Sequence, residues 1–234
     1  MIRRDTPVHH WFENVIHSAG EKLKITEHSV LILLAFLVGT VTGTVAVGFR
    51  WLVISSQDFF FNTGINFLNS SIGSISELVI PIIPAAGGLF VGLIVFYYAW
   101  EAKGHGVPEV MAAVALKGGL IRFRLALAKA IASAICIGSG GSAGREGPIV
   151  AIGSAVGSNI GQRFGMSGER IKVLVGCGSA AGIAAVFNAP IAGVLFALEI
   201  ILGDFAIHTF SPVILSAVTA SVVSHYFVGN FPAF

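Results

Sequence analysis

The chain has 234 residues, of which 55% are hydrophobic and only 11% are charged, whereas soluble domains usually carry about 25% charged residues. This composition excludes an ordinary soluble domain and indicates a polytopic helical membrane protein. The net charge of +2 is too small, and the basic residues are too dispersed, for a nucleic-acid-binding surface. Two cysteines, Cys136 and Cys177, lie in apolar segments and have no metal-ligand spacing.

The N-terminal part predicts one helix that lies on the membrane and one that crosses it. Residues 6–25 are amphipathic, so residues 1–28 are assigned to an interfacial helix on the cytoplasmic side. Residues 29–49 are uncharged and long enough to span a bilayer, and the helix can continue past Arg50. One face of this helix carries small residues that permit close packing, namely Gly39, Gly43 and Gly48.

A polar loop is expected at 59–76 and a second span at 78–100, which ends in aromatic residues typical of a membrane interface. Lys and Arg are absent between Arg50 and Lys103, whereas basic residues precede the first span and follow the second. The positive-inside rule therefore places the N-terminus and residues 101–124 in the cytoplasm and the polar loop outside.

Beyond residue 100 the apolar segments become short and are interrupted by glycine. Two breaks have the same form, a glycine-rich turn with a proline at the start of a helix, at 104–108 and 144–148. Half-helices whose N-termini converge on one site are typical of ion transporters, because their free N–H groups bind anions. Helices are expected over 109–116, 125–137, 148–164, 172–186, 190–202 and 210–228.

Three charged or titratable residues stand out in these apolar segments. A charge at mid-bilayer costs about 2.5 kcal/mol or more and usually marks a site. Glu146 is predicted to be functional, because an ion pair with its neighbour Arg145 is geometrically poor on a helix. Lys129 is interpreted either as a snorkelling side chain or as a pathway or structural charge. His105, which stands between two glycines before a helix that begins with proline, is expected to line the site.

These motifs resemble the signature sequences of the CLC family of chloride channels and proton/chloride exchangers. The matching residues are Gly104-His105-Gly106-Val107-Pro108, Gly144-Arg145-Glu146-Gly147-Pro148 and the segment 188–199. The resemblance implies an all-α fold of broken and tilted helices, built from two inverted repeats, in a homodimer with one pore per subunit. Residues 29–234 resemble the first repeat. The second repeat, with the third signature and a pore-lining tyrosine, has no counterpart here and is expected to be needed for a complete pore.

The resemblance also implies roles for individual residues. Glu146 matches the gating glutamate, whose carboxylate competes with anions for the pore. His105 stands where the family usually has serine, which predicts a changed ion preference or pH-sensitive conduction. The positions implied to bind or select the anion are Gly104, His105, Gly106, Val107, Pro108, Gly144, Arg145, Gly147 and Pro148.

One position bears on coupling to protons. Exchangers of the family typically carry a proton-transferring glutamate just after the position of Glu199, where this chain has Ile200. An aliphatic side chain cannot relay protons, so passive, channel-like chloride conduction is favoured, with proton-coupled antiport as the alternative. A non-conducting, truncated membrane component is a third hypothesis. Lys129 and Glu199 are candidate charges along the pathway.

The resemblance and the residues together predict a transporter and not an enzyme. The sequence has no Ser–His–Asp or Cys–His set at membrane depth and no metal cluster. We therefore expect no cofactor and no metal; the expected partners are a transported anion such as chloride, the bilayer and a second copy of the chain. The expected location is a prokaryotic-type inner or plasma membrane.

Overall fold

The computed structural model describes residues 27–64, 81–98 and 106–229, and within these ranges it contains helices and turns but no strand. The predicted all-α class is confirmed. The predicted interfacial helix falls almost wholly outside the described residues. The described helices are α2 (Glu27–Gln57), α5 (Ile82–Tyr98), α6 (Val107–Leu116), α7 (Phe123–Gly138), α8 (Glu146–Arg163), α9 (Gly168–Phe187), α10 (Pro190–Phe196) and α11 (Ile207–Val228), with two π-helical segments, η1 (Asp58–Gly64) and η3 (Ala197–Leu202).

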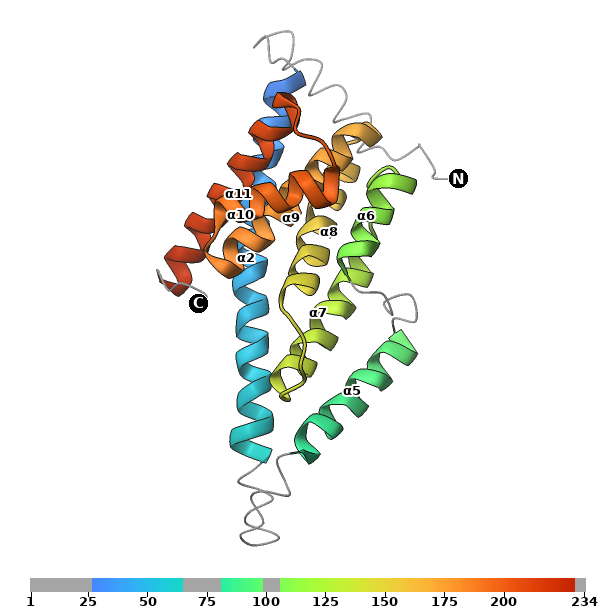
Figure 1. Cartoon of the computed structure of the whole chain (residues 1–234), viewed down its shortest axis with the longest axis vertical. Coiled ribbons are helices and arrows are strands. Elements are labelled where there is room, and N and C mark those ends of the chain that lie inside the picture. The colour runs from blue at the N-terminus through green and yellow to red at the C-terminus, as the bar shows by residue number, and fades with distance from the viewer. Residues whose placement is uncertain (1–26, 65–80, 99–105, 230–234) are drawn as a thin grey trace, which may run out of the picture.

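Helix α2 runs along most of the long axis of the molecule (Figure 1). It passes Arg50 without a break and continues into η1, so the prediction that the first span extends is confirmed. The prediction of a loop from residue 59 was wrong as far as residue 64. Phe61 gives the physical reason, because its ring packs beside Gly140 at the end of α7 and holds this last turn against the protein.

The second predicted span, 78–100, lies partly outside the described residues. Helix α5 has 17 described residues and contacts α7 and η1, while its outer face is apolar and exposed, with Leu89 at 68%. Among the described residues, three helices are long and apolar enough to cross a membrane: His28–Asn62, Gly168–Phe187 and Ile207–Val228.

The short helices after residue 106 follow the predicted order, and most begin two to four residues earlier than predicted. The reason is that the apolar pattern marks only the core-facing part of each helix. The first turn often contains glycine or a charged residue instead, as in Gly168-Glu169 of α9. Helix α9 is almost wholly buried and packs against α2, α8, α10 and α11. The fold is therefore arranged around α9.

Glycines set the spacing of the helices around α9. Gly153 of α8 and Gly178 of α9 face each other so closely that a Cβ on either one would collide with the carbonyl group of the other. On α2, a Cβ at Gly43 would lie 3.0 Å from Ala220 of α11, and one at Gly39 would lie 2.5 Å from the backbone oxygen of Ser216. The predicted packing role of Gly48 was wrong, because a Cβ there would meet nothing within 4 Å.

Hydroxyl groups join the same helices without introducing charge. Ser216 and Ser224 of α11 donate hydrogen bonds to the backbone oxygens of Cys177 (3.0 Å) and Ala185 (2.7 Å) in α9. Serine hydroxyls that bond across helices are a common way to hold membrane helices together, since lipid cannot satisfy them. The packing thus relies on close backbone contact and short polar bonds.

Candidate functional site

The two glycine-rich breaks meet in space. Gly106 is buried, has a φ of 82° and precedes α6, and a Cβ placed on it would lie 2.7 Å from the backbone oxygen of Gly147 in α8. Only glycine accepts both this backbone conformation and this contact. Helices α6 and α8 begin near mid-height of the molecule and run towards the same end (Figure 1). The structure therefore brings the starts of two half-helices to one point.

The first turns of these helices present unpaired N–H groups. The first intrahelical bonds run from Val110 N–H to Gly106 oxygen and from Ile149 N–H to Arg145 oxygen. The N–H groups of Val107 and Gly147, which precede these residues, have no acceptor within their helices. Pro108 and Pro148 carry no N–H and fill positions where none is needed. The paired helix starts thus have positive potential and free donors, which suits an anion.

Glu146 is the first residue of α8, and its exposed carboxylate folds back against Gly144. Arg145, the residue that precedes the helix, is also exposed. Within the described part of the chain, neither side chain has an ion-pair partner, so the two neighbours do not neutralise each other. A carboxylate in the first turn is favourably placed in the field of the helix. It stands where it can compete with an incoming anion.

Two predicted site residues, Gly104 and His105, lie outside the described residues. The structure places the others, apart from Lys129, in two groups. The first group surrounds the contact between α6 and α8 and consists of Gly106, Val107, Pro108, Gly144, Arg145, Glu146, Gly147 and Pro148.

The second group lies on a separate cavity of about 570 Å³ beside η3. Glu199 and Ile200 both line it, together with Asp204 and His208 near the start of α11. Ile200, which stands at the position predicted to decide proton coupling, therefore lines the same cavity as several titratable side chains. Among the described residues no group of three or more His, Cys, Asp or Glu side chains could hold a metal ion.

Lys129 of α7 forms an ion pair with Glu109 of α6, with 2.8 Å between Nζ and Oε2. The lysine side chain is only 11% exposed and the glutamate 32%. This pair ties the first turn of α6 to α7, next to the convergent helix starts. Glu109 was missed from the sequence, although two opposite charges in neighbouring apolar segments were a signal that could have found it.

Replacement of Lys129 by methionine is expected to lower the free energy of unfolding by about 1–3 kcal/mol, because the carboxylate of Glu109 loses its partner at a partly buried position. The double variant Lys129→Met/Glu109→Gln should recover part of this loss. Thermal unfolding in detergent measures both. Lys172→Met is the control, since Lys172 pairs with the 86% exposed Glu169, and such pairs contribute about 0–1 kcal/mol. Equal losses in Lys129→Met and Lys172→Met would contradict a structural role of the buried pair.

The geometry agrees with the similarity to known proteins. A family model described as voltage gated chloride channel matches residues 87–234. The putative chloride channel protein ClcB-like of Ralstonia nicotianae is 39% identical over 152 residues, which is 63% of this chain and 35% of that protein. The voltage-gated ClC-type chloride channel ClcB of Escherichia coli is 32% identical over 198 residues, which is 83% of this chain and 46% of that protein.

Solved structures share the fold. A slow cyanobacterial Cl⁻/H⁺ antiporter matches with a TM-score of 0.74 at 24% identity, over 86% of this chain and 48% of that chain. At this identity the likeness shows the fold alone. A CLC-type fluoride/proton antiporter matches with a TM-score of 0.69 at 26% identity, over 89% of this chain and 51% of that chain.

This chain spans about half the length or less of the proteins that it matches. The signature motifs, the arrangement of broken helices around α9 and the family match over residues 87–234 agree with one another. The chain is an integral membrane protein and belongs to the CLC family of voltage-gated chloride channels.

Proposed function

We propose that the protein moves chloride, or a similar small anion, across the membrane past the point where α6 and α8 meet. The observation that carries this proposal is the contact between Gly106 and Gly147, which brings the positive ends of two helices together. The names of the relatives, a chloride channel and antiporters of chloride and fluoride, support the choice of anion. This chain spans about half of those proteins, and the family resemblance implies that a complete pore also needs a second repeat.

The free N–H groups of Val107 and Gly147 would bind the anion in place of its hydration shell. The carboxylate of Glu146, attached to the same helix start, would compete with the anion for this positive field. A proton on that carboxylate removes the competing charge and frees the site. Glu146 therefore acts as a gate whose position depends on the anion and on pH.

Passive, channel-like conduction is our first candidate mechanism, because Ile200 cannot carry a proton. Proton-coupled antiport is the second candidate. It is favoured by the antiporters among the solved structures and by the position of Glu199 and His208 on the same cavity as Ile200. A different side chain on that cavity could take the place of the usual glutamate.

Reconstituted liposomes distinguish the two mechanisms. With an outward chloride gradient, passive conduction predicts chloride efflux that protein-free liposomes do not show, and no proton movement against a proton gradient. Uphill proton movement in fixed ratio to chloride would establish antiport and overturn the channel assignment. The absence of chloride flux in the protein with both repeats would contradict anion transport and leave the non-conducting hypothesis.

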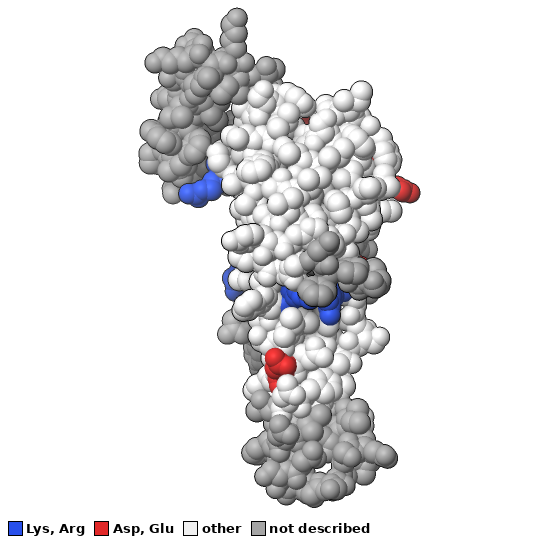
Figure 2. Space-filling view, turned by 90° about the vertical axis from the view of Figure 1, so that its left-hand side faces the viewer, with Lys and Arg blue, Asp and Glu red and all other residues white. Residues whose placement is uncertain are grey.

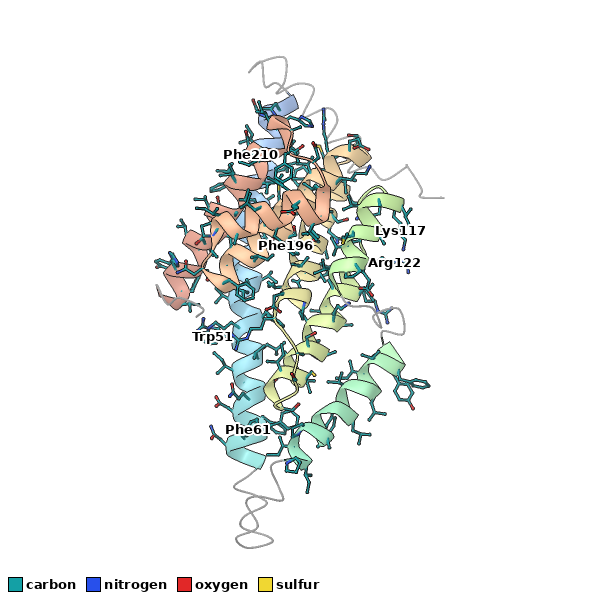
Figure 3. All side chains as sticks on the ribbon, in the orientation of Figure 1. Trp51, Phe61, Lys117, Arg122, Phe196 and Phe210 are labelled. Atoms are coloured by element: carbon teal, nitrogen blue, oxygen red, sulfur yellow. The ribbon has the colours of Figure 1, made fainter. Side chains whose placement is uncertain are left out.

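We also propose the orientation and the assembly from the same resemblance. The basic residues Lys117 and Arg122 lie at the outer edge of the molecule, after α6 and towards the end where α2 begins (Figure 3). The positive-inside rule makes that end cytoplasmic. A homodimer in an inner or plasma membrane follows from the family and is testable by cross-linking in native membranes. No cofactor is required for this activity.

A further inference from the structure

A cavity of about 90 Å³ lies between α2, the start of α8 and the last turns of α9 and α11. Most of the residues that line it are apolar, but Arg50 of α2 and Arg145 at the start of α8 both line it. Gln57 and Ser224 add two further polar groups. None of the described residues that line the cavity is acidic. It is separate from the contact between Gly106 and Gly147.

The two arginines have no neutralising partner. In the described part of the chain, neither guanidinium donates a hydrogen bond or forms an ion pair. Lys129, by contrast, is neutralised by Glu109. The ends of α9 and α11 offset some of the arginine charge. Nevertheless, two like charges line one small cavity and repel each other. An anion between them would turn this repulsion into attraction.

The position of the cavity favours an occupant from water. Helices α9 and α11 are both long enough to cross a membrane, and both end beside it. The carbonyl groups at a helix end need water or protein partners, which favours contact of the cavity with an aqueous space. Figure 2 shows the side of the molecule on which α2 and α11 lie, where a few basic side chains stand at mid-height on an otherwise almost uncharged surface.

We propose that Arg50 and Arg145 bind a small inorganic anion in this cavity and deliver it to the adjacent start of α8. Arg145 directly precedes Glu146, so an anion held by the arginine pair is next to the gate before it enters. Fixed positive charge at a mouth raises the local anion concentration. The delivery step rests on the proposed function, whereas anion binding by the arginine pair does not.

Trp51 provides a reporter beside the cavity, because it follows Arg50 in α2, although its 67% exposed side chain projects from the helix and does not line the cavity (Figure 3). We would replace Trp11 and Trp100 by phenylalanine and titrate the fluorescence of Trp51 with bromide in a zwitterionic lipid. Saturable quenching is expected. Arg50→Gln should weaken it at least about threefold, while Arg50→Lys should keep most of it. Acrylamide, a neutral quencher, should act equally on all variants.

Lys117→Gln is the matched control, since it removes one exposed cation far from Trp51. Equal bromide quenching in Arg50→Gln and Lys117→Gln would overturn the proposal. Loss of the bromide response when phosphatidylglycerol is added would also overturn it, because a lipid phosphate would then be the occupant.

Transport provides the second arm of the test. Arg50→Gln should raise the chloride concentration for half-maximal flux and leave the maximal flux unchanged. If the protein conducts no chloride but Trp51 still reports saturable, Arg50-dependent binding, the proposed function fails and the arginine site stands.

Discussion

The variant Glu146→Gln is expected to transport chloride faster than the wild type at neutral pH and to lose the dependence of transport on pH. Glutamine keeps the size of the side chain but cannot compete with an anion as a charged group. In the wild type, protonation neutralises the carboxylate, so transport should rise as the pH falls. If the carboxylate blocks the site in about nine of ten molecules, the variant is about tenfold faster at neutral pH. Chloride efflux from liposomes at about pH 7.5 and about pH 4.5 measures both effects.

The control for this experiment makes the same chemical change elsewhere. Asp58 lies in the first turn of η1, is exposed and accepts a hydrogen bond from the side chain of Asn62. Asp58→Asn should keep the pH response of the wild type. A Glu146→Gln variant that still accelerates on acidification would show that another group controls the gate.

The largest loss of stability is expected from Gly178→Ala. A single methyl group at Gly178 would collide with the carbonyl group of Gly153. Because the clash is between two backbones and not with a flexible side chain, α8 and α9 must separate along their length. We expect a loss of about 3 kcal/mol, which corresponds to a fall in the melting temperature of roughly 6–12 °C. Thermal unfolding and gel filtration in detergent measure the change.

Gly48→Ala is the matched substitution in α2. It adds the same methyl group to a helical glycine, but into space that is open to at least 4 Å. Alanine favours the helix by about 0.5–1 kcal/mol over glycine, so this variant should unfold at the same temperature or slightly higher. A similar loss in both variants would mean that the contact between α8 and α9 does not limit stability.

Much of this architecture could be predicted because short local patterns in the sequence indicate membrane helices. Apolar runs, glycine breaks and the prolines at 108 and 148 indicated where the helices after residue 100 begin and end. The convergence of α6 and α8 was expected from the repetition of one motif. The close contact between the two helix starts could not be predicted, because only the folded backbone shows that Gly106 and Gly147 touch.

The features that could not be predicted from the sequence depend on tertiary contacts. Gly48 has the same spacing pattern as Gly39 and Gly43, yet nothing packs against it. The continuation of α2 through residues 58–64 depends on the contact between Phe61 and Gly140, from a segment eighty residues away. Similarly, two separate arginines become a candidate site only when α2 and α8 bring them to one cavity.

In the π-helical segment η3, the number of residues matters as much as their identity for which side chains face the neighbouring cavity. A π-turn holds one more residue than an α-helical turn in the same place. Deletion of one residue within Ala197–Leu202 would let α10 continue as an α-helix while the residues after the segment keep their places. The side chains within the segment would change direction, so a different set would face the cavity that Glu199 and Ile200 now line. A one-residue insertion or deletion in this segment can therefore change the lining of the cavity without any substitution at position 200.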